Sequence, residues 1–158
     1  MTEINYMKMI EIDFLSPSEA KGHCHFQQRE SLGQRWQNIA MDIIPFGLVI
    51  EACYQLCGRL VRLRTDETSV GIIVSTRNLK FLRPVLVGEK LQFSARWLKT
   101  TENDVSIFDC KVASESYPII TQSQIWLKHY PVPSTADFNS STLQILHENQ
   151  DKLKGLCL

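Results

Sequence analysis

The sequence predicts an α+β domain in which an antiparallel sheet wraps around one long central helix, with a short helical extension at the C-terminus. Three observations support this fold class. A long apolar segment with helical spacing begins near Ile44, at least four strand-like runs follow it, and another strand-like run precedes it. A helix that is apolar over most of its circumference must be enclosed, and a single surrounding sheet is the economical solution.

Length and composition limit the possible classes of protein. A chain of 158 residues suits one domain, and we expect this domain to span residues 1–130, followed by an extension with a short helix at 131–158. The chain holds 17 basic and 17 acidic residues, so its formal net charge is zero. Because nucleic-acid binders normally carry a basic excess, we expect no nucleic-acid partner.

The sequence also argues against membrane insertion and against metal or disulfide chemistry. No run approaches the roughly 18 apolar residues of a membrane span, and the N-terminus lacks the pattern of a signal peptide, so we expect a cytoplasmic protein without a membrane partner. The five cysteines show no CxxC spacing. Cys53 and Cys57 lie four apart in the apolar helix, which favours small buried side chains over metal ligands.

The elements before the helix are less regular. Residues 1–14 are expected to form a short strand or a helix, and the composition of residues 16–20 predicts a turn. A strand is expected at residues 21–28, followed by an irregular polar loop at 29–38.

The central helix begins near Pro45, a residue favoured in a first helical turn, and Gly58 lies late inside it or near its end. Its apolar face has helical spacing and comprises Leu48, Val49, Ala52, Cys53, Leu56, Leu60 and Val61.

The second half of the sequence has the composition of strands. Its runs are rich in Ile, Val, Phe, Trp and Thr, and the breaks between them are short enough for antiparallel hairpins or a meander. In the tail, Ser140 or Ser141 is expected to cap a final helix that ends at Gly155. The four expected strands span residues 70–82, 89–100, 104–114 and 118–130.

Two segments resemble one enzyme superfamily. The stretch IPFGLVIEACYQLCG is similar to the central-helix motif of hot-dog fold enzymes, in particular β-hydroxyacyl-acyl-carrier-protein dehydratases of the FabZ and FabA type, with Glu51 and Gln55 at the acidic and glutamine positions. The stretch NLKFLRPVLVGEKLQF resembles the hairpin of the same enzymes. The matching residues of this hairpin are Arg83, Pro84, Val85, Gly88, Glu89 and Leu91.

This resemblance implies a hot-dog homodimer, or a heterodimer with a homologous subunit, that acts on acyl chains. The substrate would be carried on the phosphopantetheine of an acyl carrier protein or on coenzyme A, and the enzyme itself would need no cofactor and no metal. In these dehydratases a histidine and a carboxylate act together as general base and acid. By resemblance, Glu51 is the catalytic carboxylate, and the substrate contacts are Phe46, Gly47, Gln55 and Arg83.

The histidine half of the pattern is missing. Counting back from Glu51 without a gap places Gln37 where the family has its catalytic histidine. An amide polarises or orients a carbonyl but takes no proton at neutral pH. His25 is an alternative base if it reaches across the sheet, although the alternation of its strand also fits an exposed face.

Three functions therefore stay open. The first is a dehydratase-like enzyme of a fatty-acid or polyketide pathway, with Glu51 and Gln37 as its catalytic residues. The second is a hot-dog acyl thioesterase that uses Glu51, with Gln37 near the thioester. The third is a non-catalytic subunit of a heteromeric complex, in which a homologous partner supplies the histidine and this chain keeps the carboxylate. For Glu51 itself, the alternative to a catalytic role is a solvated polar stripe with Gln55 and Arg59 or Arg62.

Overall fold

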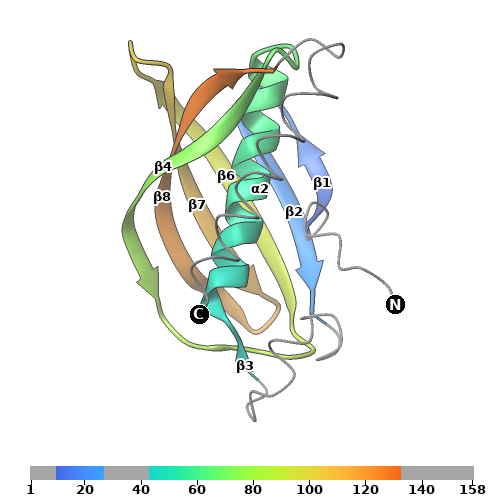
Figure 1. Ribbon diagram of the computed structural model, residues 1–158. Helices are drawn as coiled ribbons and strands as arrows, with labels where there is room; N and C mark the ends of the chain where they lie inside the picture. The colour runs from blue at the N-terminus through green and yellow to red at the C-terminus, as the bar shows by residue number, and fades with distance from the viewer. Residues whose placement is uncertain (1–9, 27–42, 133–158) are drawn as a thin grey trace, which may run out of the picture.

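The computed structural model describes residues 10–26 and 43–132, and shows one long helix packed against one face of a large antiparallel sheet (Figure 1). This arrangement confirms the predicted α+β architecture. The six strands of the sheet are hydrogen-bonded in the order β1-β2-β6-β7-β8-β4. The elements are β1 (Glu11–Leu15), β2 (Glu19–His25), β3 (Ile43–Ile44), α2 (Phe46–Arg64), β4 (Ser69–Phe81), β5 (Val85–Leu86), β6 (Lys90–Thr100), β7 (Val105–Ser114) and β8 (Tyr117–Pro131).

The core lies between α2 and the sheet. Strand residues alternate between the helix side, where they are buried, and the outer side, where they are more exposed. On the helix, the buried face matches the apolar face predicted from the sequence with three exceptions: Leu48 is half-buried, and Ile50 and Cys57 are buried as well. The buried helix residues are Val49, Ile50, Ala52, Cys53, Leu56, Cys57, Leu60 and Val61.

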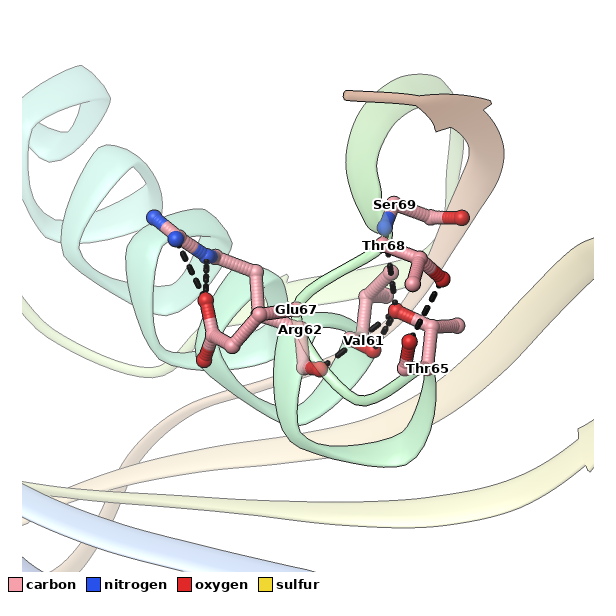
Figure 2. A network of polar contacts seen from close by, with 6 residues as sticks. All are labelled: Val61, Arg62, Thr65, Glu67, Thr68 and Ser69. Atoms are coloured by element: carbon pink, nitrogen blue, oxygen red, sulfur yellow. Dashed lines mark hydrogen bonds and ion pairs between the residues drawn. The ribbon is translucent and has the colours of Figure 1, made fainter. Parts of the chain in front are cut away.

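The helix has the expected start, and a polar network fixes its end. Pro45 immediately precedes the first helical residue, Phe46. At the other end, Thr65 donates from its backbone N–H and from its hydroxyl to the carbonyl oxygen of Val61, at 3.0 and 2.9 Å. Arg62 forms an ion pair with Glu67 in the following turn, as Figure 2 shows. These contacts reverse the chain sharply, so that β4 begins beside the end of α2.

The path of β4 differs from the sequence-based expectation. β4 pairs with β8 along its length, from Ser69 opposite Pro131 to Phe81 opposite Thr121, and so forms one edge of the sheet. β6 is separated from β4 by β7 and β8, so the RPVLVG connection passes these two strands instead of closing a hairpin. The prediction of a hairpin there was wrong. Within it, β5 pairs with β3 in a small second sheet that the sequence did not predict. The other two breaks do connect neighbouring strands, β6 to β7 and β7 to β8.

The N-terminal strands form the opposite edge. The segment of uncertain type contains β1, and β2 begins at Glu19, within the predicted turn. A methyl group on Gly22 would lie 2.5 Å from the carbonyl oxygen of Glu11, so this glycine is what allows β1 to approach β2 closely. The predicted C-terminal helix and the polar loop at 29–38 lie outside the described residues, so the domain boundary at residue 130 stays a prediction.

Candidate active site

Glu51 lies on one stripe of α2 together with Gly47 and Gln55, because residues four apart share a face of a helix. Its side chain is half-buried, and the Gln55 amide donates a hydrogen bond to its Oε1 at 3.3 Å. Side chains of a helix lean toward its N-terminus, so Glu51 leans over the turn that contains Gly47. A methyl group added to Gly47 would meet no atom of residues 10–26 and 43–132 within 4 Å. Within this part of the chain, the stripe that carries Glu51 therefore has open space at the start of the helix.

The start of α2 is itself suited to hold an oxyanion. No side chain caps it, and its first turn carries no acidic residue. Phe46 is 65% exposed, and Gly47 is exposed as well. The N–H groups of a first helical turn lie at the positive end of the helix dipole and lack the usual partner four residues back. The Leu48 N–H donates to the carbonyl oxygen of Pro45 at 3.0 Å, which leaves the N–H groups of Phe46 and Gly47 for an oxyanion. The predicted site residues Phe46, Gly47, Glu51 and Gln55 are thus brought together by one helix.

Two contacts that the sequence did not reveal tie this part of the helix to the edge strand β4. The hydroxyl of Tyr54 lies 2.7 Å from the hydroxyl of Thr76, and the ring centroids of Phe46 and Phe81 lie 5.1 Å apart. Tyr54 follows Glu51 by three residues, and it was unremarkable in the sequence because a tyrosine at that spacing is also an ordinary packing residue. Both contacts fix the distance between the candidate site and β4.

Arg83 is the fifth predicted site residue, and its guanidinium holds together the connection between β4 and β6. It binds Glu89 through two hydrogen bonds, of 3.0 and 2.6 Å, and donates to Ser114 and to the carbonyl oxygen of Pro84 at 3.1 and 2.7 Å. Its Cζ lies 4.0 Å from the centroid of the Tyr117 ring. Pairing with Arg83 lowers the pKa of Glu89, which also accepts the Leu86 N–H. The predicted contact of Arg83 with substrate stays a prediction.

The two candidates for the missing base differ in position. Gln37 lies outside the described residues. His25 points to the outer face of the sheet, since its neighbours Cys24 and Phe26 are buried and His25 itself is exposed. There its Nε2 lies 3.1 Å from the carbonyl oxygen of Gly88. Glu51 is on the helix side, so the hypothesis that His25 replaces the catalytic histidine within the same chain was wrong.

The four cysteines among the described residues are unsuited to nucleophilic chemistry. Cys53, Cys57 and Cys110 are at most 1% exposed, as expected of small core residues, and the sulfur atoms of Cys57 and Cys110 lie 3.2 Å apart. Burial is the main reason that the pKa of Cys53 is raised well above its usual value, and burial also raises the pKa of Cys24 to about 11. Since the thiolate is the reactive form, these thiols are inert at neutral pH.

Near the C-terminal end of α2, away from Glu51, a serine and a histidine lie within hydrogen-bonding distance of each other. The Nε2 of His129 is 2.8 Å from the hydroxyl of Ser106, which is in turn 2.7 Å from the hydroxyl of Thr100. Ser106 is fully buried, so no substrate can contact its oxygen. Burial lowers the pKa of His129. This network joins β6, β7 and β8 and has no access to a reacting group.

The described residues contain neither a metal-binding cluster nor a membrane-spanning helix. Within residues 10–26 and 43–132, no three His, Cys, Asp or Glu side chains are grouped so that they could hold a metal ion. Over the same residues, no helix has both the length and the apolar character that crossing a membrane requires.

The chain resembles solved structures but no characterised sequence. No family model matches it, and no curated protein does. A thioesterase from Haemophilus influenzae, HI1161, is 15% identical with a TM-score of 0.62, over 80% of this chain and 81% of that one. A hypothetical thioesterase from Streptococcus pneumoniae, solved with coenzyme A, is 11% identical with a TM-score of 0.63, over 84% of this chain and 94% of that one. Zebrafish thioesterase superfamily member 2 is 14% identical with a TM-score of 0.61 (78% and 83%). This likeness establishes the hot-dog fold.

The ion pair of Arg83 and Glu89 leads to a prediction about stability. Glu89→Gln should lower the free energy of unfolding at pH 7 by about 1–3 kcal/mol, because the guanidinium loses its charged acceptor. A carboxylate whose pKa is lowered in the folded state stabilises the fold above its unfolded pKa of about 4.5, and this contribution is lost as pH falls through the folded pKa.

Urea unfolding of the variant should therefore show a smaller loss of stability than the wild type between about pH 5 and pH 3. Glu102→Gln is the matched control, since Glu102 is exposed in the turn between β6 and β7. Equal pH profiles for Glu89→Gln and wild type would show that the ion pair does not stabilise the fold.

Proposed function

We propose that the chain is an acyl thioesterase with the hot-dog fold, and that Glu51 is its general base. The observation that carries the proposal is the position of this carboxylate on α2. Glu51 shares a stripe of the helix with Gly47, near the start of α2, and its Oε1 accepts a hydrogen bond from the Gln55 amide. The likeness to thioesterases, one of them solved with coenzyme A, supports the same class of substrate. We favour coenzyme A over an acyl carrier protein as the carrier for that reason.

The proposed reaction is hydrolysis of the thioester. Glu51 takes a proton from a water molecule whose oxygen attacks the carbonyl carbon. The N–H groups at the start of α2 stabilise the negative charge that forms on the carbonyl oxygen. The bond between carbon and sulfur then breaks, and the sulfur leaves as a thiol after taking up the proton. We assign to the Gln37 amide a hydrogen bond to the thioester carbonyl, because an amide is suited to that role and unsuited to removing a proton.

The dehydratase hypothesis, which the sequence motifs favoured, has less support. Dehydration needs one group to remove the proton next to the thioester and a second to protonate the departing hydroxyl, and the amide of Gln37 does neither at neutral pH. The similar structures named above are thioesterases, and their likeness extends to the fold alone. Hydrolysis needs only one such group, which Glu51 provides.

We further propose that the enzyme is a dimer formed through the outer edge of β4. In the six-stranded sheet, this edge has no neighbouring strand among the described residues. Ile72, Ile73 and Val74 follow one another along it and are 51%, 43% and 52% exposed. A long apolar edge strand is otherwise open to aggregation, and pairing with a second copy covers it. Because Tyr54 and Phe46 contact β4, such a partner would lie close to Glu51.

The first prediction tests Glu51. Purified protein should release free thiol from acyl-coenzyme A, and Glu51→Gln should lower kcat by about 10²–10⁴-fold while leaving the unfolding midpoint close to that of wild type. Thiol release can be followed with a colorimetric thiol reagent. Glu102→Gln should retain full activity.

Three other outcomes of these assays would contradict the proposal. An enoyl product from 3-hydroxyacyl-coenzyme A, without release of thiol, would favour the dehydratase. Inactivity toward thioesters on both coenzyme A and acyl carrier protein would favour the non-catalytic subunit. Full activity of Glu51→Gln would remove Glu51 from the mechanism.

A second prediction uses two glycines of the same helix. Gly47→Ala has room for its methyl group, and alanine is the better helix former, so the variant should be at least as stable as wild type. We nevertheless expect it to lose about tenfold or more in kcat/KM, because the methyl group would stand where the thioester approaches the helix. Gly58→Ala, which also has room, should be stabilised without loss of activity. Unchanged kcat/KM in Gly47→Ala would place the substrate elsewhere.

A third prediction concerns the dimer. Val74→Lys should convert the dimer to monomer, because a two-fold interface places the new charge in it twice. Light scattering after gel filtration measures the mass, and thiol release should fall with the dimer fraction. Leu98→Lys is the control, since Leu98 is 37% exposed but lies on β6, between two other strands. A wild-type protein that is monomeric yet active would contradict the proposal.

A further inference from the structure

The outer face of the sheet, opposite α2, has a cavity of about 520 Å³ that the proposed reaction does not use. Its floor is formed by outward-facing residues of three neighbouring strands. Lys21 of β2 is paired with Ser94 of β6, which is paired with Lys111 of β7, so the two lysines flank the serine in one row across the sheet. Gln92 and Lys90 lie two and four residues before Ser94 and share its face.

The balance of charge in this cavity is positive. Lys21, Lys90 and Lys111 line it against a single carboxylate, that of Asp13. Asp13 is already engaged, since its Oδ1 lies 2.8 Å from Nδ1 of His23, whereas Nε2 of the same ring lies 3.4 Å from Glu11. Lys21 contacts Glu19 at 3.3 Å. Among the described residues, Lys90 and Lys111 have no carboxylate within 4.0 Å, and an anion placed between the lysines would relieve their mutual repulsion.

The other residues that line the cavity indicate which groups a ligand carries besides its negative charge. The hydroxyl of Ser94 and the amide of Gln92 are hydrogen-bonding groups between the lysines. Phe14 forms one wall and is 48% exposed, with Nζ of Lys21 5.9 Å from its ring centroid. Pro118 adds a second apolar surface. The volume falls within the range of about 300–1,000 Å³ that is usual for small-molecule sites.

From these observations we infer that the outer face of the sheet binds a small phosphorylated molecule with a flat ring, of which a nucleoside monophosphate is the representative. The phosphate lies among Lys21, Lys90 and Lys111, and the ring packs against Phe14. The site is independent of the proposed thioesterase activity, because Glu51 is on α2 and the sheet separates the two.

Calorimetric titration of the full chain tests the site with three probes: adenosine monophosphate, adenosine and inorganic phosphate. Adenosine monophosphate should bind, and adenosine should bind at least about tenfold more weakly, because it lacks the charge that the lysines recognise. The affinity for the monophosphate should also fall as salt is added. Absence of binding at millimolar concentration, or equal affinity for adenosine, would overturn the inference. Phosphate that binds as tightly as the monophosphate would overturn the role of Phe14.

The variants assign the binding to this cavity. The double variant Lys90→Gln with Lys111→Gln should weaken adenosine monophosphate by about tenfold or more, and both side chains are exposed, so the fold should be unaffected. Lys99→Gln changes another exposed lysine of β6 that does not line the cavity, and it should bind like the wild type. Thiol release should be the same in the double variant, the control variant and the wild type. Equal affinity in the double variant and the control would place the binding elsewhere.

Discussion

The packing of α2 against one face of the sheet is the contact on which the other features depend. Ala52, Cys53 and Cys57 are small, and all are at most 1% exposed, so the helix axis can approach the strands closely. Larger side chains such as Leu56 and Leu60 then fill the space on either side. Because this face is fully used for packing, the polar groups of α2 are confined to the remaining stripe, where Glu51 and Gln55 lie. The helix that supplies the core therefore also fixes where a catalytic carboxylate can stand.

The edge strand β4 follows from the same packing. The turn after Arg64 returns the chain along the helix, so β4 reaches the sheet beside β8 and ends next to the start of α2. Gly71 faces the helix without a side chain, and a methyl group there would lie 2.9 Å from Leu127 and 3.1 Å from Val61. The inner side of β4 thus packs tightly, whereas its outer side presents Ile72 and Val74. This asymmetry is the basis for proposing that a second subunit pairs with β4.

Much of this fold could be predicted from the sequence, because helical and strand periodicities are local properties. The helix and the four strands after it were placed within a few residues. The pairing of β4 with β8 could not be predicted from the sequence. It depends on the route of the connection after β4, and the composition of that connection fits a hairpin equally well. Likewise, the sequence marked Arg83 and Glu89 only as members of a motif. Their mutual hydrogen bonds, and those from Arg83 to Ser114, require the ends of β4, β6 and β7 to be brought together.

For the candidate site, the sequence identified the residues but not how they lie relative to one another in space. Glu51 and Gln55 were found through the resemblance to a family motif. The structure adds that they lie near the start of the helix, on the element that contacts β4 through Phe46 and Tyr54. The face of His25 was left open by the sequence, because alternation in a strand shows which residues share a face but not which face the helix covers, and the structure places His25 on the exposed face. Because a sheet has two faces, it also separates the outer lysines from the carboxylate of Glu51. With α2 covering one face, the lysines of β2, β6 and β7 can point only outward, and the carboxylate of Glu51 stays on the other side. Two ligands of different chemistry can then be recognised by one sheet without either charge disturbing the other.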